Sequence, residues 1–155
     1  MRQPRNWERK DQRGAVLVEM ALVLPILLFL FVGVVDYGLI LREYQILQNA
    51  AREGARLSIL PAYCIDTAGS QQNAVRDAIK QRVVDYLANE NITILASDVA
   101  VDQNVTISGG GGGSLPTIGS KITVTYNRSV LIGNGWPFGS IALRGEAEFR
   151  NLNCS

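Results

Sequence analysis

An acidic residue lies inside an apolar segment long enough to cross a membrane, and this feature constrains the chain most. The segment runs from Ala15 to Val35. Its 21 residues would form about 31 Å of helix, which matches the hydrocarbon core of a bilayer. Glu19 lies about one turn inside the segment, where an ionised group costs roughly 2.5 to 3.5 kcal/mol. We therefore predict a function for Glu19, the alternative being that its carboxylate extends to the nearby headgroups.

The charges on either side of this segment predict its orientation. Five basic and two acidic residues precede Gly14, whereas ten basic and twelve acidic residues follow from Ala15 onward. The positive-inside rule keeps residues 1–14 in the cytoplasm and exports the rest. A cleaved signal peptide would have a shorter apolar region followed by small residues, but Asp36 and Tyr37 follow here. The segment is thus predicted to be retained as a single-pass anchor.

The residues around the start of the anchor resemble a known processing site. Gly14, with Glu19 at the fifth position after it and a short basic leader before it, resembles the cleavage site of type IV prepilins. The segments that follow resemble the TadE-like family, the minor pilins or pseudopilins of bacterial tight-adherence pili. They are Ala21-Leu22-Val23-Leu24-Pro25, Val35-Asp36-Tyr37-Gly38 and Asn49-Ala50-Ala51-Arg52-Glu53-Gly54-Ala55-Arg56. The resemblance covers about Arg13 to Leu60.

This resemblance implies a mechanism and a set of partners. Prepilin peptidase would cut after Gly14, and Ala15 would then carry a free amine with a pKa of about 7.7 to 8.0. Glu19 lies four residues further on the same helical face and would pair with that amine, in its own chain or in a neighbour. The other implied partners are the bacterial inner membrane, other pilins and pilus assembly proteins. Met20 stands where the small major pilins typically have Tyr, which favours a minor subunit.

The helix is predicted to continue beyond the membrane to Leu60, where Pro61 ends it. Inside the anchor, Pro25 removes a backbone donor and is expected to bend or loosen the helix. Beyond the anchor, residues at three- and four-residue spacing form one stripe. Its members are Ile40, Tyr44, Leu47, Ala51, Gly54, Ala55 and Ser58. Because the far end of the stripe is made of small residues, we expect another backbone to approach closely there.

The rest of the chain predicts a small α+β head, in which one helix packs on an antiparallel sheet. Ser70 is a candidate N-cap for a helix that ends near Asn89. Its predicted apolar face contains Val75, Ala78, Ile79, Val83, Tyr86 and Leu87. Alternating apolar residues predict three strands, with Val99, Val101, Val105 and Ile107 in the first, Ile122, Val124 and Tyr126 in the second, and Ile141, Leu143, Ala147 and Phe149 in the third. The predicted domains are therefore a leader (1–14), a helix (15–60) and an exported head (61–155).

Two loops and two cysteines add further hypotheses. The glycine run 109–113 is either a flexible hairpin connection or a linker foreign to the natural chain. Trp136 and Phe138 lie in a second loop, where they either plug the end of the core or form a partner surface. Cys64 and Cys154 are the only cysteines. In an exported domain they predict one disulfide, with two free thiols as the alternative.

Composition excludes several classes of function. The chain has no histidine, so it cannot form a Ser-His-Asp or Cys-His nucleophile or a histidine metal site. No calcium-loop spacing is present, and no Lys-Ser/Thr follows the glycine run as a phosphate loop would require. A formal charge of +1 gives no reason to expect nucleic acid. We predict no enzyme, cofactor or small-molecule substrate, and the alternative to a pilin is an unprocessed single-pass protein with an exported binding or adhesin head.

Overall fold

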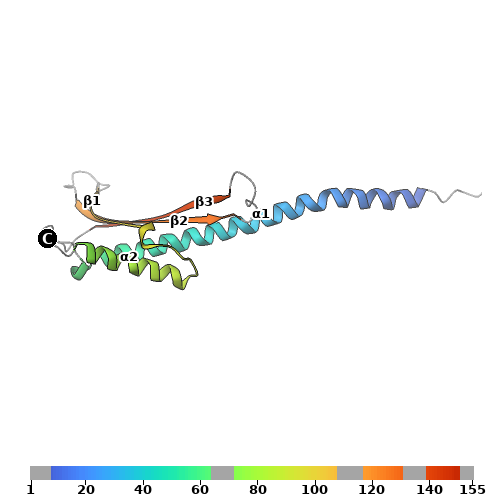
Figure 1. The fold of residues 1–155 in the computed structure, drawn as a ribbon. Helices are drawn as coiled ribbons and strands as arrows, with labels where there is room; N and C mark the ends of the chain where they lie inside the picture. The colour runs from blue at the N-terminus through green and yellow to red at the C-terminus, as the bar shows by residue number, and fades with distance from the viewer. Residues whose placement is uncertain (1–7, 64–71, 108–116, 131–138, 151–155) are drawn as a thin grey trace, which may run out of the picture. The chain divides into compact units, whose positions relative to one another are not determined.

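The computed structural model describes residues 8–63, 72–107, 117–130 and 139–150 (Figure 1). It contains a long helix, α1 (Glu8–Ser58), a second helix, α2 (Gln72–Asn89), and three strands, β1 (Val99–Ile107), β2 (Thr117–Ser129) and β3 (Ser140–Arg150). Short 3-10 turns, η1 (Pro61–Tyr63) and η2 (Ala96–Asp98), precede α2 and β1. These elements confirm the predicted α+β class. The chain divides into two units, Met1–Leu39 and Ile40–Ser155, and each is described by itself.

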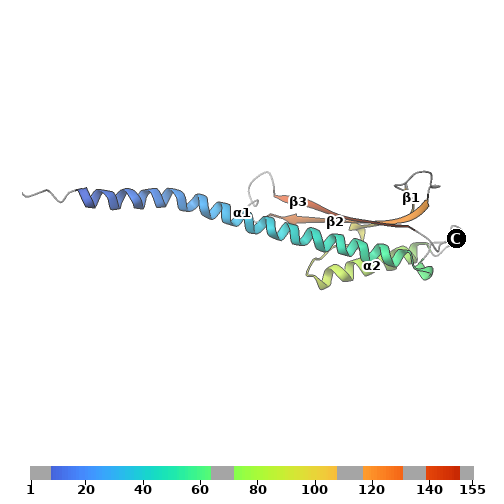
Figure 2. The same ribbon diagram turned by 180° about the vertical axis from the view of Figure 1, so that it is seen from behind.

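In the second unit, two helices cover one face of a small sheet. The strands pair antiparallel in the order β1-β2-β3. Figures 1 and 2 show α2 and the last part of α1 on the same side of this sheet. The core lies between these layers and draws on all five elements. Its fully buried aliphatic members are Leu47, Ala50, Ala51, Ala55, Ile79, Val83, Leu87, Ile122 and Val124.

The small residues of α1 allow the close approach that the sequence predicts. Gly54 and Ala55 are buried, and a methyl group added at Gly54 would lie 2.6 Å from Val83 Cγ2 of α2. The sheet also has a glycine at a close contact, Gly145 of β3. A methyl group added there would lie 2.6 Å from the backbone carbon and oxygen of Leu47 in α1. Tyr44 departs from the predicted stripe, because it is exposed. The buried face of α1 passes beside it, through Leu47 and the small residues.

A bulge in β1 changes the face on which its later residues lie. Asp102 pairs with Lys121 and Val105 pairs with Gly119, so β1 has one residue more than β2 over this stretch. The backbone N–H of Asn104 donates to Asp102 Oδ1 at 3.0 Å, which stabilises the extra turn. Val99 and Val101 lie on the same face as their partners in the core. Past the bulge the inward and outward positions of β1 are exchanged, so that Val105 does not continue this face as simple alternation predicts. The side chain of Ile107 lies outside the described part of the chain.

Helix α2 ends in a Schellman motif. Asn91 has a φ of 62°, a left-handed conformation that asparagine adopts more readily than most residues. The N–H of Ile92 donates to Leu87 O at 2.9 Å and the N–H of Asn91 donates to Ala88 O at 3.1 Å. Ile92 and Leu87 are both buried, as this motif favours. The predicted apolar face of α2 is confirmed except at Ala78, which is exposed because it lies beside the row of buried residues at 79, 83 and 87.

The end of α1 is held by a side chain from the bulge. Gln103 Nε2 donates to Ser58 O at 3.0 Å and to Tyr63 O at 2.9 Å, and both Gln103 and Ser58 are buried. Ser58 Oγ also donates to Ala55 O at 2.7 Å. The last carbonyls of a helix lack partners within the helix, so these bonds satisfy groups that would otherwise be buried unpaired. The prediction that the helix ends before Pro61 is thus correct, but its cap comes from a distant strand.

Candidate functional site

The predicted processing motif lies within α1. Gly14, Ala15 and Glu19 are helical and exposed. Because Ala15 and Glu19 are four residues apart in a helix, they share one face. Apart from its chain neighbours and the backbone of its own helix, no atom of the described residues lies within 4 Å of a methyl group placed on Gly14. The folded chain therefore sets no steric requirement for glycine here, and any need for it comes from outside the chain.

The apolar side chains that follow the motif are exposed along the helix. Every large apolar side chain from Val16 to Val35 is 38 to 71 % exposed. Among the described residues, the structure has one helix long and apolar enough to cross a membrane, Gly14–Ser58, and its most apolar window is not buried. Such a surface costs about 25 cal/mol per Å² in water. Contact with lipid or with other apolar helices would remove that cost.

Two residues within this helix differ from the apolar side chains around them. Pro25 lies inside α1, and the helix continues on both sides of it. Asp36 is 4 % exposed, although its neighbours Val35 and Tyr37 are 43 and 62 % exposed. The sequence analysis used Asp36 to mark the end of the apolar segment and as part of the resembling segment Val35-Asp36-Tyr37-Gly38, and it assigned the carboxylate no role. A carboxylate placed directly after the 16 residues Met20–Val35, none of which is charged, was the available signal.

The head carries a shielded ion pair that the sequence did not reveal. Arg128 Nε of β2 lies 3.3 Å from Glu43 Oε2 of α1, and the two side chains are 9 and 22 % exposed. Glu43 belongs to a charged cluster beside the predicted stripe, and Arg128 lies at an inward position of β2. Nothing in the local pattern links residues 85 positions apart. The pair ties the first turns of α1 in the head to the central strand.

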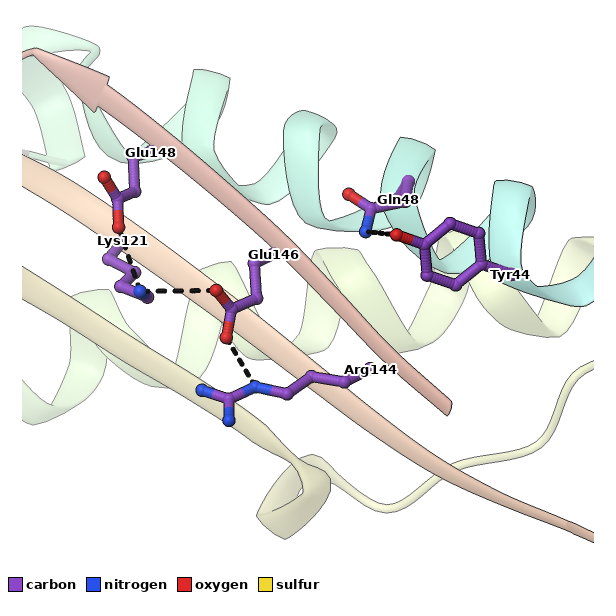
Figure 3. A network of polar contacts seen from close by, with 6 residues as sticks. All are labelled: Tyr44, Gln48, Lys121, Arg144, Glu146 and Glu148. Carbon is purple, nitrogen blue, oxygen red and sulfur yellow. Dashed lines mark hydrogen bonds and ion pairs between the residues drawn. The ribbon is translucent and has the colours of Figure 1, made fainter. Parts of the chain in front are cut away.

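The outer face of the sheet carries an exposed charge network (Figure 3). Lys121 Nζ lies 2.9 Å from Glu148 Oε1 and 3.3 Å from Glu146 Oε2, and Arg144 pairs with the other oxygen of Glu146. Hydrogen bonds to Glu148 and then Glu146 raise the pKa of Lys121 above its ordinary value. Exposed pairs of this kind contribute little to stability. This network gives the sheet a polar outer face, as the charged alternate positions of β3 predict.

Several predicted residues lie outside the described part of the chain. They are Ser70, the glycine run 109–113, Cys64, Cys154, Trp136 and Phe138. The disulfide and the aromatic partner surface therefore stay predictions. Within the described ranges, no group of three or more Cys, Asp or Glu side chains is arranged to hold a metal ion. The candidate site is thus the apolar helix and the motif at its start.

Fold and site together define a protein with one candidate membrane-spanning helix followed by a small α+β head. The family model for TadE-like proteins matches residues 14–56, from the predicted cleavage position to the buried small residues of α1. This match confirms the resemblance seen in the sequence, and it fits a membrane protein associated with tight-adherence pili. Comparison with curated proteins and with solved structures found no match.

Proposed function

We propose that this protein is a membrane-anchored minor pilin or pseudopilin of a bacterial tight-adherence pilus, acting in pilus assembly, adhesion or associated secretion. The observation that carries the proposal is the position of Gly14 and Glu19 at the start of an exposed apolar helix, where the TadE-like match also begins. The anchor lies in the inner membrane, with residues 1–14 in the cytoplasm and the head exported. This orientation follows from the charge asymmetry.

In this proposal, prepilin peptidase removes residues 1–14 and changes the chemistry of the helix start. The cut leaves a positively charged amine on Ala15 in place of a peptide N–H. In a filament, the apolar helices leave lipid and pack against one another, and Glu19 pairs with the Ala15 amine of a neighbouring subunit. The pair lies in low-dielectric surroundings, where each charge needs the other.

Processing is tested by substitution at Gly14. We expect Gly14→Ala protein to insert normally, because the helix has room for the methyl group, and to keep all 155 residues. Wild type from the same peptidase-containing strain should lack residues 1–14. The measurement is the intact mass of protein purified from membranes. Normal trimming of Gly14→Ala, or full-length wild type, would favour the alternative of an unprocessed single-pass protein with an exported binding or adhesin head.

The role of Glu19 is tested by Glu19→Leu, with Glu19→Asp as the control that keeps the charge. If Glu19 pairs with a neighbour's amine, its loss costs roughly 3 to 5 kcal/mol, a factor of 100 or more in association. We expect Glu19→Leu protein to stay in the membrane and to be cleaved, but not to crosslink to other pilins or support pili. Glu19→Asp should retain part of both. Normal pilus output from the Glu19→Leu strain would show that Glu19 only reaches the headgroups.

A further inference from the structure

The outer side of α1 in the head carries a row of positive charge. Arg42, Arg52 and Arg56 are exposed and share one stripe, opposite the buried face of the helix. Among the described residues no carboxylate pairs with any of the three, and Arg52 Nη1 donates only to Asn49 Oδ1 at 3.4 Å. Arg56 lies in the last turn of the helix, where a cation is favourable, but it repels Arg52 one turn away. The described part of the head therefore gives Arg52 a like charge and no opposite one.

The outer side of α2 carries the opposite charge. Asp77 and Asp85 are exposed, and both lie on the half of the helix opposite its buried face. Asp85 Oδ1 accepts a hydrogen bond from Gln81 Nε2 at 2.8 Å, but within the described ranges neither carboxylate forms an ion pair. The nearby Arg82 pairs instead with Glu53 of α1 at 3.2 Å. The two helices thus present a basic stripe and an acidic stripe next to each other.

The close contact between the helices shows which of their residues lie at the same level. Gly54 of α1 lies against Val83 of α2. Figures 1 and 2 show that α2 runs back along α1 from the C-terminal end of that helix. Asp85 is two residues past Val83, and Arg52 is two residues before Gly54. Because the helices run in opposite directions, Asp85 and Arg52 are level with each other.

A two-fold axis parallel to the helices and placed against their outer side would bring the opposite charges together. This rotation keeps every residue at its level and places α1 of one copy on α2 of the other. Arg52 of each copy then faces Asp85 of the other copy. Asp77 is level with a point about one turn beyond Arg56, so these two charges lie near each other in the same arrangement. The contact is isologous, so each dimer contains both pairs twice.

We propose that Arg52, Arg56, Asp77 and Asp85 form a self-association surface, through which two copies of this chain pair by their heads. The occupant is a second copy because the basic and acidic stripes are complementary and level with each other within a single chain. Complementary charges of this kind fix the register of an interface and suppress other partners. The inference goes beyond the proposed function, since the heads would pair in this way whether or not residues 1–14 have been removed.

Charge reversal tests the pairing. The measurement is the association constant of the full chain in detergent micelles at about 0.15 M salt, from analytical ultracentrifugation. Arg52→Glu and Asp85→Arg each oppose like charges in the dimer, so we expect each variant alone to associate about tenfold or more weakly than wild type. An equal mixture of the two variants should recover the wild-type affinity, because every pair in the mixed dimer again joins opposite charges.

Arg42→Glu is the matched control. It makes the same change of charge on the same stripe of α1, but the position level with Arg42 lies beyond the end of α2. Arg42 is also about 15 Å along the helix from Arg52, more than a Debye length at this salt concentration. We therefore expect the association constant of Arg42→Glu to stay within about twofold of wild type.

Four results would overturn the proposal. A monomeric wild type would mean that solvent or another protein meets this surface. Association that neither reversal weakens would mean that the copies meet elsewhere, for example through the apolar helix. A mixture that does not recover would mean that each reversal acts within its own chain, and an equal loss in Arg42→Glu would mean that only net charge matters. These results do not depend on cleavage after Gly14 or on pilus output, so they are independent of the tests of the proposed function.

Discussion

At the residue scale, two glycines of the head stand where a methyl group has no room, and they differ in what blocks it. At Gly145 the obstacles are the backbone carbon and oxygen of Leu47, each 2.6 Å from the added methyl group. At Gly54 the obstacle is a side-chain methyl of Val83, at the same distance. A side chain can rotate or shift, whereas a helix backbone moves only with its neighbours. The strand glycine is therefore the more stringent requirement.

We predict that Gly145→Ala lowers the free energy of unfolding of the head by about 1 to 3 kcal/mol, because β3 must move away from α1 to admit the methyl group. Gly54→Ala is the matched control. It should cost less, since alanine favours the helix by about 1 kcal/mol over glycine and so offsets part of the crowding. The measurement is urea unfolding of the full chain in detergent. A larger loss in Gly54→Ala would contradict the comparison.

At the scale of elements, the bulge in β1 and the end of α1 depend on each other. The extra residue of the bulge turns the strand at Gln103, and the Gln103 side chain binds the two carbonyls of Ser58 and Tyr63. Both bonds need an N–H donor. A glutamate has nearly the same shape, but it would place a carboxylate oxygen against the two carbonyl oxygens. The cap therefore depends on the amide and not only on the size of the side chain.

We predict that Gln103→Glu destabilises the head by about 1 to 3 kcal/mol, because buried carbonyls lose their donor and a carboxylate takes its place. Gln48→Glu is the control, since Gln48 makes one exposed hydrogen bond to Tyr44 and its change should stay within about 0.5 kcal/mol. Hydrogen exchange should also become faster in the last turn of α1. Unchanged exchange there would mean that Gln103 does not cap the helix.

Sequence patterns predicted the elements well and their mutual contacts poorly. The period of apolar residues located α2 and the three strands, and the small residues of α1 predicted a close approach. The reversal at Val105 was missed because a bulge is set by pairing with β2 and not by the residues of β1 alone. Tyr44 is a member of the predicted stripe but is exposed, because the stripe is wider than the face that the sheet and α2 cover. The roles of Gln103 and Arg128 depend on partners 40 or more residues away.

At the candidate site, the motif could be predicted from the sequence, but the exposure of the carboxylates of Glu19 and Asp36 could not. Gly14, Glu19 and the apolar segment are local features, and the family match begins at the same position. That Glu19 is exposed while Asp36 is buried depends on the folded chain. Both residues look alike in a hydropathy pattern. Only the structure separates the exposed carboxylate from the buried one.

At the scale of the whole molecule, the predicted disulfide would join the segment after α1 to the end of the chain. Closing a loop of about 90 residues stabilises by at most about 4 to 5 kcal/mol. We expect exported wild type to show Cys64 joined to Cys154 under non-reducing conditions. Cys154→Ser should raise protease sensitivity near the C-terminus. Peptide mapping checks both, and quantitative labelling of the two thiols in native protein would remove the disulfide.

The close fit of Gly145 against Leu47 also sets the order in which the head can form. The two residues are 98 positions apart, and β3 is the last of the described elements. The face of α1 around Leu47 therefore stays uncovered until β3 has been synthesised, however early α1 itself becomes helical. Long-range contacts of this kind fold slowly, and the uncovered surface is prone to association in the meantime. In the orientation that we propose, the head would therefore finish folding only after β3 has crossed the membrane, and until then it would be a client for chaperones on the exported side.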